Sequence, residues 1–205
     1  MAERAHPDGP GFRRQFHLRW VGGVIPFPVV KSNPYRDALF WRYRYVQAYC
    51  RGKDVVDIPC GMGWGTAMLS GCKSLLGLDV ADDAISEAQR RYGSYCTFRK
   101  GNMARLDLPD ASVDLVSCLE GIEHVPPEIG ESFIAECSRV LRDGGELIVS
   151  SPHCNDAPHS GNPYHFKEYQ PDELRALVSR RFSVLYEEMR IVDNLTVTMF
   201  HLRRR

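Results

Sequence analysis

Three glycines alternate in a short loop that follows an apolar run, a spacing suited to ligand binding. The apolar run is 54–58, and the loop after it contains Gly61, Gly63 and Gly65. Glycine has no Cβ, so the backbone can turn tightly and lie against a ligand that another side chain would push away. The first amides of the next helix would point into the same space. The loop therefore predicts a small-ligand site at the end of a strand.

The spacing of this loop also separates two classes of ligand. A dinucleotide fingerprint reads G-x-G-x-x-G, but Thr66 stands where the third glycine of that pattern belongs. The loop therefore argues against a nicotinamide dehydrogenase. Asp79 ends a second apolar run, 74–80, where a carboxylate can accept hydrogen bonds from a ribose diol. Helix capping is the alternative role for such a residue, and we expect Asp82 or Asp83 to fill it.

Apolar runs and helical patterns alternate along the chain. Strands are expected at 54–58, 74–80, 95–100, 113–119 and 146–150, and helices at 64–70, 81–91, 128–141 and 171–178. Two further β segments, 182–187 and 196–202, are joined by too few residues for a crossover helix, so they should be antiparallel. The sequence predicts an α/β fold with a Rossmann-like, doubly wound, mostly parallel sheet of about seven strands that ends in an antiparallel hairpin.

The length of 205 residues suits a single domain. We divide it into an arm or lid at 1–33, which is rich in glycine and proline, an aromatic helix at 34–51, and the Rossmann-like core at 52–205. The arm is expected either to close over the acceptor or to contact a second copy in a homodimer.

Charge and cysteine content disfavour several classes of protein. The 26 Lys and Arg residues balance 26 Asp and Glu residues, which argues against a nucleic-acid partner. Seven cysteines include no C-x-x-C pair, so neither a zinc ribbon nor a disulfide framework is indicated. The longest apolar stretch, 20–30, contains two glycines and two prolines and is too short to span a membrane. We expect a cytoplasmic protein with reduced thiols and no membrane partner.

Four segments together resemble the class I S-adenosylmethionine (SAM)-dependent methyltransferases. They are D-I-P-C-G-M-G-W-G-T, G-L-D-V, V-D-L-V-S-C-L-E-G-I-E-H-V and F-I-A-E-C-S-R-V-L-R-D-G-G-E-L-I-V-S-S-P. The resemblance runs from about residue 44 to the C-terminus. It implies that SAM is the cofactor, that S-adenosylhomocysteine (SAH) is the product, and that the glycine loop wraps the methionine part of SAM.

The same resemblance implies a role for each residue around the cofactor. It places Asp79 on the ribose, Asn102 with Met103 beside the adenine, and Asp57 near the sulfonium. The pair at 44–45 resembles an Arg-Tyr pair that meets the methionine carboxylate. All residues expected to bind the cofactor lie at strand ends, in the loops after them or in the N-terminal helix: Arg44, Tyr45, Asp57, Pro59, Gly61, Gly63, Gly65, Asp79, Val80, Asn102, Met103, Glu120 and Gly121.

One residue departs from the pattern of the family. Pro59 stands where a glycine usually begins the loop. Because proline fixes φ near −65° and has no amide hydrogen, we expect a trans, extended peptide at the start of the loop and the loss of one cofactor contact. A loop disabled by this change would leave a non-catalytic SAM-binding protein, which is one alternative function.

A second group of residues indicates the acceptor side. Glu120 and His124 follow the fourth strand, and the segment N-P-Y-H-F-K-E-Y at 162–169 precedes the next helix. Similar N-P-x-H-x-x-E-Y segments occur in methyltransferases that resemble those of bacterial sugar and polysaccharide biosynthesis. A general base contributes most when the acceptor is a hydroxyl, and imidazole takes up a proton near neutral pH. The expected catalytic residues are His165, His124 and Glu120; the alternatives are that His124 packs under the following helix and that His165 bonds a loop carbonyl.

A metal-dependent alternative uses an overlapping set of side chains. Glu120, Glu123, His124 and His165 resemble the metal site of the small-RNA 3′-terminal 2′-O-methyltransferases. Such ligands would suit Mg²⁺ or Mn²⁺, whereas the zero net charge argues against RNA. We therefore expect a metal-free, SAM-dependent methyltransferase that acts at an oxygen of a small-molecule or sugar acceptor.

Overall fold

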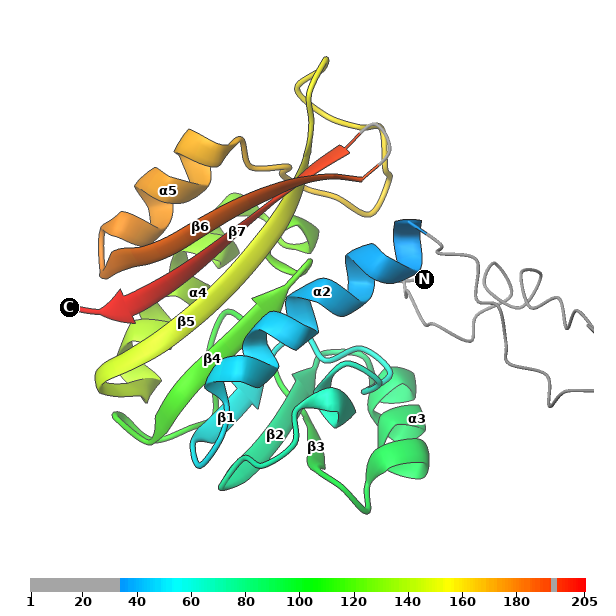
Figure 1. Cartoon of the computed structure of the whole chain (residues 1–205), viewed down its shortest axis with the longest axis vertical. Coiled ribbons are helices and arrows are strands. Elements are labelled where there is room, and N and C mark those ends of the chain that lie inside the picture. The colour runs from blue at the N-terminus through cyan, green and yellow to red at the C-terminus, as the bar shows by residue number, and fades with distance from the viewer. Residues whose placement is uncertain (1–33, 193–194) are drawn as a thin grey trace, which may run out of the picture.

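A seven-stranded sheet in the order β3-β2-β1-β4-β5-β7-β6 forms the centre of the molecule (Figure 1). The computed structural model describes residues 34–192 and 195–205, so the arm at 1–33 lies outside the described residues. β7 is antiparallel to both of its neighbours, and the other neighbouring strands are parallel. The strands are β1 (Asp54–Asp57), β2 (Ser74–Asp79), β3 (Thr97–Lys100), β4 (Val113–Leu119), β5 (Leu141–Cys154), β6 (Phe182–Val192) and β7 (Leu195–Arg204). The prediction of a mostly parallel sheet with a terminal antiparallel hairpin is confirmed.

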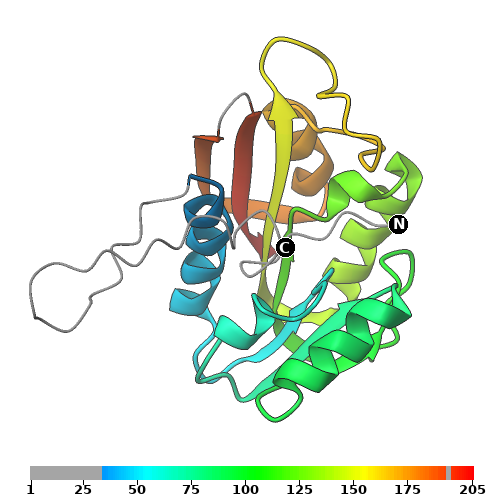
Figure 2. The ribbon, with the colours of Figure 1, turned by 90° about the vertical axis from the view of Figure 1, so that its right-hand side faces the viewer.

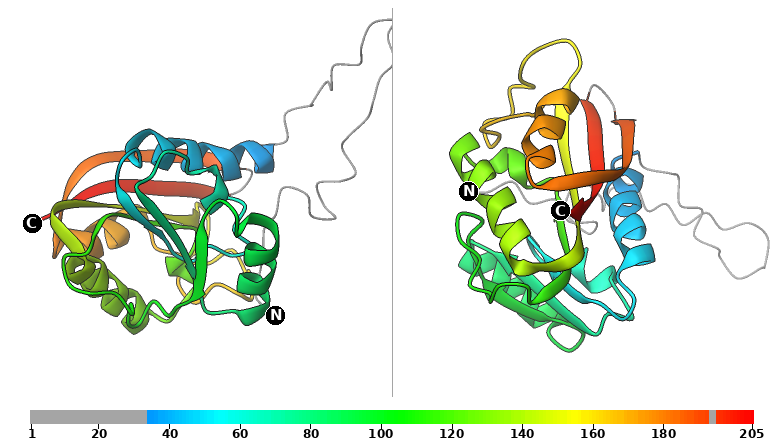
Figure 3. Two further views of the ribbon diagram at one scale, coloured as in Figure 1. Left: turned by 90° about the horizontal axis from the view of Figure 1, so that it is seen from below. Right: turned by 90° about the vertical axis from the view of Figure 1, so that its left-hand side faces the viewer.

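Helices cover both faces of this sheet. α2 (Pro34–Tyr49) lies on one face, and α4 (Pro127–Val140) and α5 (Pro171–Ser179) lie on the other (Figures 2 and 3). Because successive side chains of a strand point to opposite faces, Val55 joins the apolar core under α2 and Val56 joins the core under α4 and α5. α3 (Asp82–Tyr92) packs on Phe98 of β3. None of the described helices is long and apolar enough to cross a membrane.

The helix expected at 64–70 is reduced to a single 3₁₀ turn, η1 (Thr66–Met68). The cause lies in α2, because the Gln47 side chain pairs with the backbone of Ser70. Its Nε2 donates to the Ser70 carbonyl at 2.9 Å, and its Oε1 accepts from the Ser70 amide at 2.7 Å. Backbone groups that a longer helix would pair internally are thus satisfied by a side chain from another element. The prediction of a helix at 64–70 is therefore wrong.

β5 and β6 are longer than predicted because β7 pairs along both of them. β5 was expected to end at 150, but its pairing with β7 continues to Cys154, opposite Leu195. β6 likewise continues to Val192, beyond the expected end at 187. Pro152 lies within β5 although proline has no amide hydrogen to donate. This is possible because the pairing of β5 with β4 ends at Ser150, so no strand on that side needs a hydrogen bond from residue 152.

The start of the glycine loop also differs from the prediction. The Ile58–Pro59 peptide bond is cis, so the expected trans, extended start is wrong. Proline is the residue type for which a cis bond is common. In this conformation the ring packs against Gly121, where an added Cβ would lie 2.2 Å from Pro59 Cδ. Pro59 and Gly121 are therefore complementary in shape across the ends of β1 and β4.

Tyr43 joins α2 to the glycine loop. A Cβ on Gly65 would lie 2.1 Å from the Tyr43 ring, which is buried. The Gly65 backbone itself is ordinary, with φ −71° and ψ −45°, so any residue could adopt it. The absence of a side chain at this position is therefore required by packing and not by the backbone.

A Gly65→Ala substitution tests this packing, because the packing determines whether the substitution raises or lowers the free energy of unfolding. An alanine at an α-helical backbone position should stabilise a protein by about 0.4–1 kcal/mol because it restricts the unfolded chain. The clash with Tyr43 should instead lower the free energy of unfolding by about 1–3 kcal/mol, as measured by urea denaturation. In a Tyr43→Ala background, which removes the ring, the same substitution should no longer destabilise. Stabilisation of the single variant would contradict the packing described here.

Candidate functional site

Three acidic residues lie at the carboxyl ends of neighbouring parallel strands. Asp57 ends β1, Asp79 ends β2, and Glu120 directly follows β4. These strands are adjacent in the order β2-β1-β4. Ligands of open α/β sheets bind at this edge, beyond the carboxyl ends of the strands. The glycine loop follows β1 at the same edge, so the fold brings together the main elements of the expected cofactor site.

The three loop glycines have different roles. A Cβ on Gly61, where φ is +52°, would meet no atom within 4 Å, so this position faces open space. A Cβ on Gly63 would lie 2.7 Å from the Phe98 ring and 2.8 Å from Ala88, and the Tyr43 ring occupies the corresponding space at Gly65. The open space at Gly61 suits the expectation that a missing side chain makes room for a ligand. At the other two positions the missing side chains make room for the protein itself, and the assignment of all three glycines to the cofactor stays a prediction.

Asp79 supports the loop and retains capacity for a ligand. Its Oδ2 accepts a hydrogen bond from the Gly61 amide at 2.9 Å, and its Oδ1 accepts one from the Ala81 amide at 2.9 Å. Each carboxylate oxygen has a second lone pair, which can accept a ribose hydroxyl. Ala81 is the N-cap of α3, and its side chain makes no capping hydrogen bond. Asp82 and Asp83 stand in the first turn, where Asp83 Oδ1 accepts the Ala84 amide at 3.0 Å, so the expected contribution of an aspartate is found at a first-turn amide and not at the N-cap position.

The residues expected beside an adenine follow β2 and β3. Val80 comes directly after Asp79 and is 62% exposed, which leaves an apolar side chain ready to contact a base. Met103 is buried and Asn102 is exposed. Asn102 Oδ1 accepts the Ala104 amide at 2.8 Å, and the predicted contact of Asn102 with adenine would use Nδ2.

Asp57 is buried and is bonded by hydroxyls from three elements. Its fully buried carboxylate accepts hydrogen bonds from Thr66 Oγ1 at 2.6 Å, Ser117 Oγ at 2.7 Å and Tyr43 Oη at 3.2 Å. Burial raises the pKa of Asp57 to about 6, although the three hydroxyls lower it. These bonds give Asp57 a structural role in holding the loop, and the position near a sulfonium that the family resemblance implied stays a prediction.

The two Arg-Tyr pairs of α2 face different surroundings. Arg44 is exposed, and Tyr45 bonds His201 Nδ1 at 3.1 Å and stacks on a ring of β6. Tyr43 packs on Gly65 of the glycine loop, and Arg42 pairs with Glu120 after β4. The sequence R-Y-R-Y contains both pairs, and residues two apart on a helix point about 200° apart. The assignment of Arg44 and Tyr45 to a carboxylate stays a prediction, and Arg42 with Tyr43 is the alternative pair.

Arg42 is a buried cation that sequence reasoning missed. Its side chain is 4% exposed, and its Nη1 lies 3.7 Å from Glu120 Oε2. Its Nε is buried without a hydrogen-bond partner among the described residues. Buried polar groups are normally paired, so an unpaired guanidinium nitrogen beside the loop indicates an anionic ligand.

Glu120 holds neighbouring groups in place. Its backbone φ is +51°, which turns the chain sharply after β4. Its Oε1 accepts a hydrogen bond from Ser150 Oγ at 2.8 Å, while Oε2 pairs with Arg42. With both oxygens engaged, Glu120 suits a positioning role better than the catalytic role expected from the sequence. Gly121 next to it is buried under Pro59.

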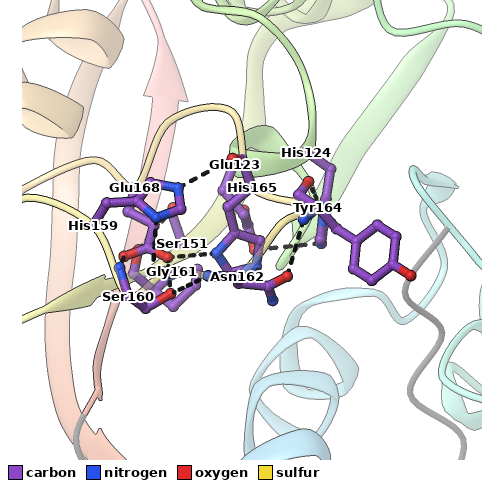
Figure 4. A network of polar contacts seen from close by, with 11 residues as sticks. Glu123, His124, Ser151, His159, Ser160, Gly161, Asn162, Tyr164, His165 and Glu168 are labelled. Atoms are coloured by element: carbon purple, nitrogen blue, oxygen red, sulfur yellow. Dashed lines mark hydrogen bonds and ion pairs between the residues drawn. The ribbon is translucent and has the colours of Figure 1, made fainter.

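Glu123, His124 and His165 form a polar cluster (Figure 4). Its first member, Glu123, comes three residues after Glu120 in the sequence. One possible ligand atom from each residue lies within 4.8 Å of the others. Glu123 and His124 belong to the 3₁₀ turn η2 (Ile122–His124). His165 is brought to them because the Glu123 carbonyl accepts the Phe166 amide at 2.7 Å. The resemblance to a four-residue metal site is thus matched by three residues, and Glu120 is not in the cluster.

The electrostatics of this cluster are set by a buried carboxylate. Glu123 is fully buried. Burial, followed by the nearby charge of Glu120, raises the pKa of Glu123 well above its ordinary value. Arg42 and the Ser151 hydroxyl act in the opposite direction but more weakly. The surroundings of Glu123 therefore favour the protonated, uncharged form of its side chain.

Both imidazoles of the cluster are oriented through Nδ1. His165 Nδ1 lies 2.7 Å from Glu168 Oε1, and His124 Nδ1 lies 3.0 Å from the Tyr164 carbonyl. Glu168 is held in turn by the amide and hydroxyl of Ser160. The loop carbonyl expected as a partner of His165 is in fact a partner of His124. Glu168 was not singled out from the sequence, although its H-x-x-E spacing from His165 was a usable signal.

Comparison with known proteins connects this site with a family. A family model described as a methyltransferase domain matches residues 55–145. A probable S-adenosylmethionine-dependent methyltransferase of Mycolicibacterium smegmatis is 35% identical over 152 residues, which cover 68% of this chain and 57% of that protein. The chain belongs to the class I SAM-dependent methyltransferases. A ubiquinone biosynthesis O-methyltransferase of Methylococcus capsulatus is 31% identical over 117 residues, covering 54% of this methyltransferase chain and 48% of the relative. The chain thus spans about half the length of the curated relatives it matches.

Solved structures share this methyltransferase fold at low sequence identity. The N-methyltransferase NodS from Bradyrhizobium japonicum, in complex with SAH, matches with a TM-score of 0.70 at 15% identity, covering 85% of this chain and 89% of that chain. The [4+2]-cyclase SpnF matches with a TM-score of 0.70 at 15% identity and covers 85% of each chain. Likeness at this identity shows the fold alone, and the cyclase illustrates that the fold does not determine the reaction.

The burial of Asp57 predicts a pH dependence of stability. The unfolded carboxyl loses its proton near pH 3.9, whereas the folded one keeps its proton to about pH 6. Folding therefore binds a proton between these values, and the free energy of unfolding should fall by about 3 kcal/mol as the pH rises through this window. Urea denaturation of the wild type and Asp57→Asn at pH 4, 5, 6 and 7 should show this loss in their difference. A difference that does not vary with pH would contradict the assignment.

Two arginine variants test the register of the Arg-Tyr pair. Arg42→Met should weaken SAM binding by about 1.5–3 kcal/mol, roughly 10- to 150-fold in Kd, through the loss of charge-assisted hydrogen bonds. Arg44→Met removes the same charge from an exposed position of the same helix and should leave the Kd unchanged. Isothermal titration with SAM and with SAH measures both. The reverse pattern would restore the pairing expected from the sequence.

Proposed function

We propose that this chain transfers a methyl group from SAM to an oxygen of a small-molecule or sugar acceptor. Membership of the SAM-dependent methyltransferases supports the cofactor and the reaction class. Relatives named O-methyltransferases support the choice of oxygen. The observation that carries the proposal is the pair of oriented imidazoles beside the buried Glu123, because removal of a hydroxyl proton is the chemical requirement that distinguishes O-methylation.

The residues around the glycine loop would hold the cofactor. The carboxylate of Asp79 would accept the ribose hydroxyls, Gly61 leaves the space beside them, and Val80 would contact the adenine. Arg42 would pair with the methionine carboxylate. When bound, SAM supplies a methyl group on a positively charged sulfonium. The loop is fixed by Asp57 and Asp79 before any ligand arrives, and such positioning supplies about 7–11 kcal/mol of the barrier reduction in reactions of this type.

The acceptor hydroxyl would lose its proton at the cluster of Glu123, His124 and His165. The hydrogen bond from His165 Nδ1 to Glu168 directs the other ring nitrogen, Nε2, into the cluster. A carboxylate that orients an imidazole in this way fixes its tautomer. Glu120, bound to Ser150 and Arg42, would hold the residues that bind the cofactor and the residues that bind the acceptor at fixed positions relative to each other.

His165→Ala tests the proposed reaction. It should lower kcat by about 10²–10⁴-fold, the usual contribution of a positioned proton acceptor, while leaving the Kd for SAH unchanged. The assay is release of SAH on a panel of phenols, vicinal diols and hydroxylated sugars. Arg44→Met, at the exposed position on α2, is the control and should keep full turnover. An unaltered kcat in His165→Ala would exclude the cluster from catalysis, and SAH binding without transfer to any acceptor would indicate a non-catalytic SAM-binding protein.

A further inference from the structure

The two edges of the sheet differ in length and in the side chains that they expose. β3, at one edge, has four residues, and its exposed side chains include Arg99 and Lys100. β6, at the other edge, has eleven residues, and among the described residues it has a neighbouring strand on one side only. Proteins prevent an edge strand from pairing with other chains by making it short or by placing charges on it. β3 is protected in both ways, whereas β6 is long.

β6 also exposes apolar side chains along its length. Met189 is 56% exposed and Ile191 is 76% exposed, and Leu185 and Tyr186 are exposed as well. The strand contains no proline, glycine or lysine that would disfavour a second partner. A long edge strand that carries exposed apolar side chains is the kind of surface that pairs with another chain.

An irregularity limits the part of β6 that can form a second strand pair. The register of β6 with β7 shifts between Val184 and Tyr186, which leaves Leu185 as an extra residue. Such a bulge bends the strand and interrupts its edge. From 186 to 192 the register is uninterrupted. The regular part of β6 is therefore this segment, and Met189 is its middle residue.

We propose that β6 pairs with β6 of a second copy of this chain, and that the chain forms a homodimer in this way. A twofold axis perpendicular to the sheet makes the two strands antiparallel and uses the same surface on both copies. The two seven-stranded sheets then form one continuous sheet. Because the axis turns the partner by 180°, the glycine loops of the two copies lie at opposite edges of this sheet.

The charges on β6 select one register for the pair. In a symmetric antiparallel pair, the residue on the axis lies opposite itself. Glu187, Glu188 or Arg190 on the axis would therefore face an identical charge, which is unfavourable. With Met189 on the axis, Glu188 lies opposite the partner's Arg190. The charges and the position of the bulge thus indicate the same axis independently.

The charged pair needed for this register is already in place within one copy. Arg190 Nε donates to Glu188 Oε1 at 2.6 Å, and the Arg190 guanidinium lies 4.3 Å from the centre of the Trp41 ring. These contacts hold Arg190 on the face of β6 that is directed toward α2. Across the axis, two such pairs form a square of alternating charges, and the two Met189 side chains meet on the other face. The surface is therefore complementary to itself, as a twofold dimer requires.

Charge reversals test the proposed register. Sedimentation velocity of the full chain should show a dimer that dissociates on dilution. Glu188→Arg and Arg190→Glu should each raise the dissociation constant of the dimer by at least about 10-fold, because like charges then meet across the axis. The double variant that carries both changes should restore dimerisation. Arg99→Glu reverses an exposed charge on the opposite edge strand and is the matched control, which should leave the dissociation constant unchanged.

Cysteine cross-linking tests the position of the axis. Residues directly opposite each other in an antiparallel pair have Cα atoms roughly 4.5–5.5 Å apart, which is within the range of a disulfide. Met189→Cys should therefore link the two copies on mild oxidation, with the linked peptide identified by mass spectrometry. Ile191→Cys should not link them, because at about 3.3 Å per residue it would lie about 14 Å from its counterpart.

The outcomes separate this interface from the proposed function. SAH affinity and far-ultraviolet circular dichroism of each variant show that it is folded. A wild-type chain that stays monomeric at every concentration would overturn the interface. A dimer that the single charge reversals leave unchanged, that the double variant does not restore, or that Ile191→Cys links while Met189→Cys does not, would overturn it equally. None of these results bears on methyl transfer, because β6 carries none of the residues proposed to bind SAM or the acceptor.

Discussion

The buried carboxylate of Asp57 is the constraint on which the rest of the site depends. Removing a carboxylate from water is unfavourable, and it is tolerated here because hydroxyls from α2, η1 and β4 converge on it. Thr66, one of these donors, stands just after the glycine loop, and Asp57 stands just before it. The same set of bonds therefore closes the loop at both ends and joins it to the helix that carries Arg42. The edge of the sheet that carries the glycine loop is therefore organised from beneath, by bonds within the protein.

Much of the fold can be predicted from local sequence patterns. The predictions fail where a contact with a residue far away in the sequence determines the structure. The strands β1 to β4 and the helices α3 to α5 are visible as apolar runs and helical periodicities. The helix expected at 64–70 is lost because Gln47, some twenty residues earlier in the chain, bonds the Ser70 backbone. The ends of β5 and β6 are set by β7, and the cis peptide before Pro59 fits against Gly121 from another strand. Sequence periodicity carries no information about such contacts.

In the candidate site, too, the types of the residues could be predicted from the sequence, but the directions of their side chains could not. Carboxylates at strand ends and histidines in the acceptor loop could be identified from their type and order. The direction of a side chain could not. The sequence R-Y-R-Y of α2 does not reveal that Arg42 and Tyr43 are buried whereas Arg44 is exposed, nor that two of the three glycines accommodate aromatic rings of the protein. Helical phase in α2 is fixed by Tyr43 on Asp57, a contact between segments that are far apart in any linear pattern.

The segment between β5 and α5 is joined to η2 through main-chain atoms. The Glu123 carbonyl receives the amides of Phe166 and Lys167, and the Tyr164 carbonyl receives His124. Hydrogen bonds made by the backbone persist when side chains change. Residues 155–164 can therefore be substituted without disturbing the strands and loops at the other end of the sheet. Exchanging this segment between relatives should therefore leave the glycine loop and the strands that carry it intact.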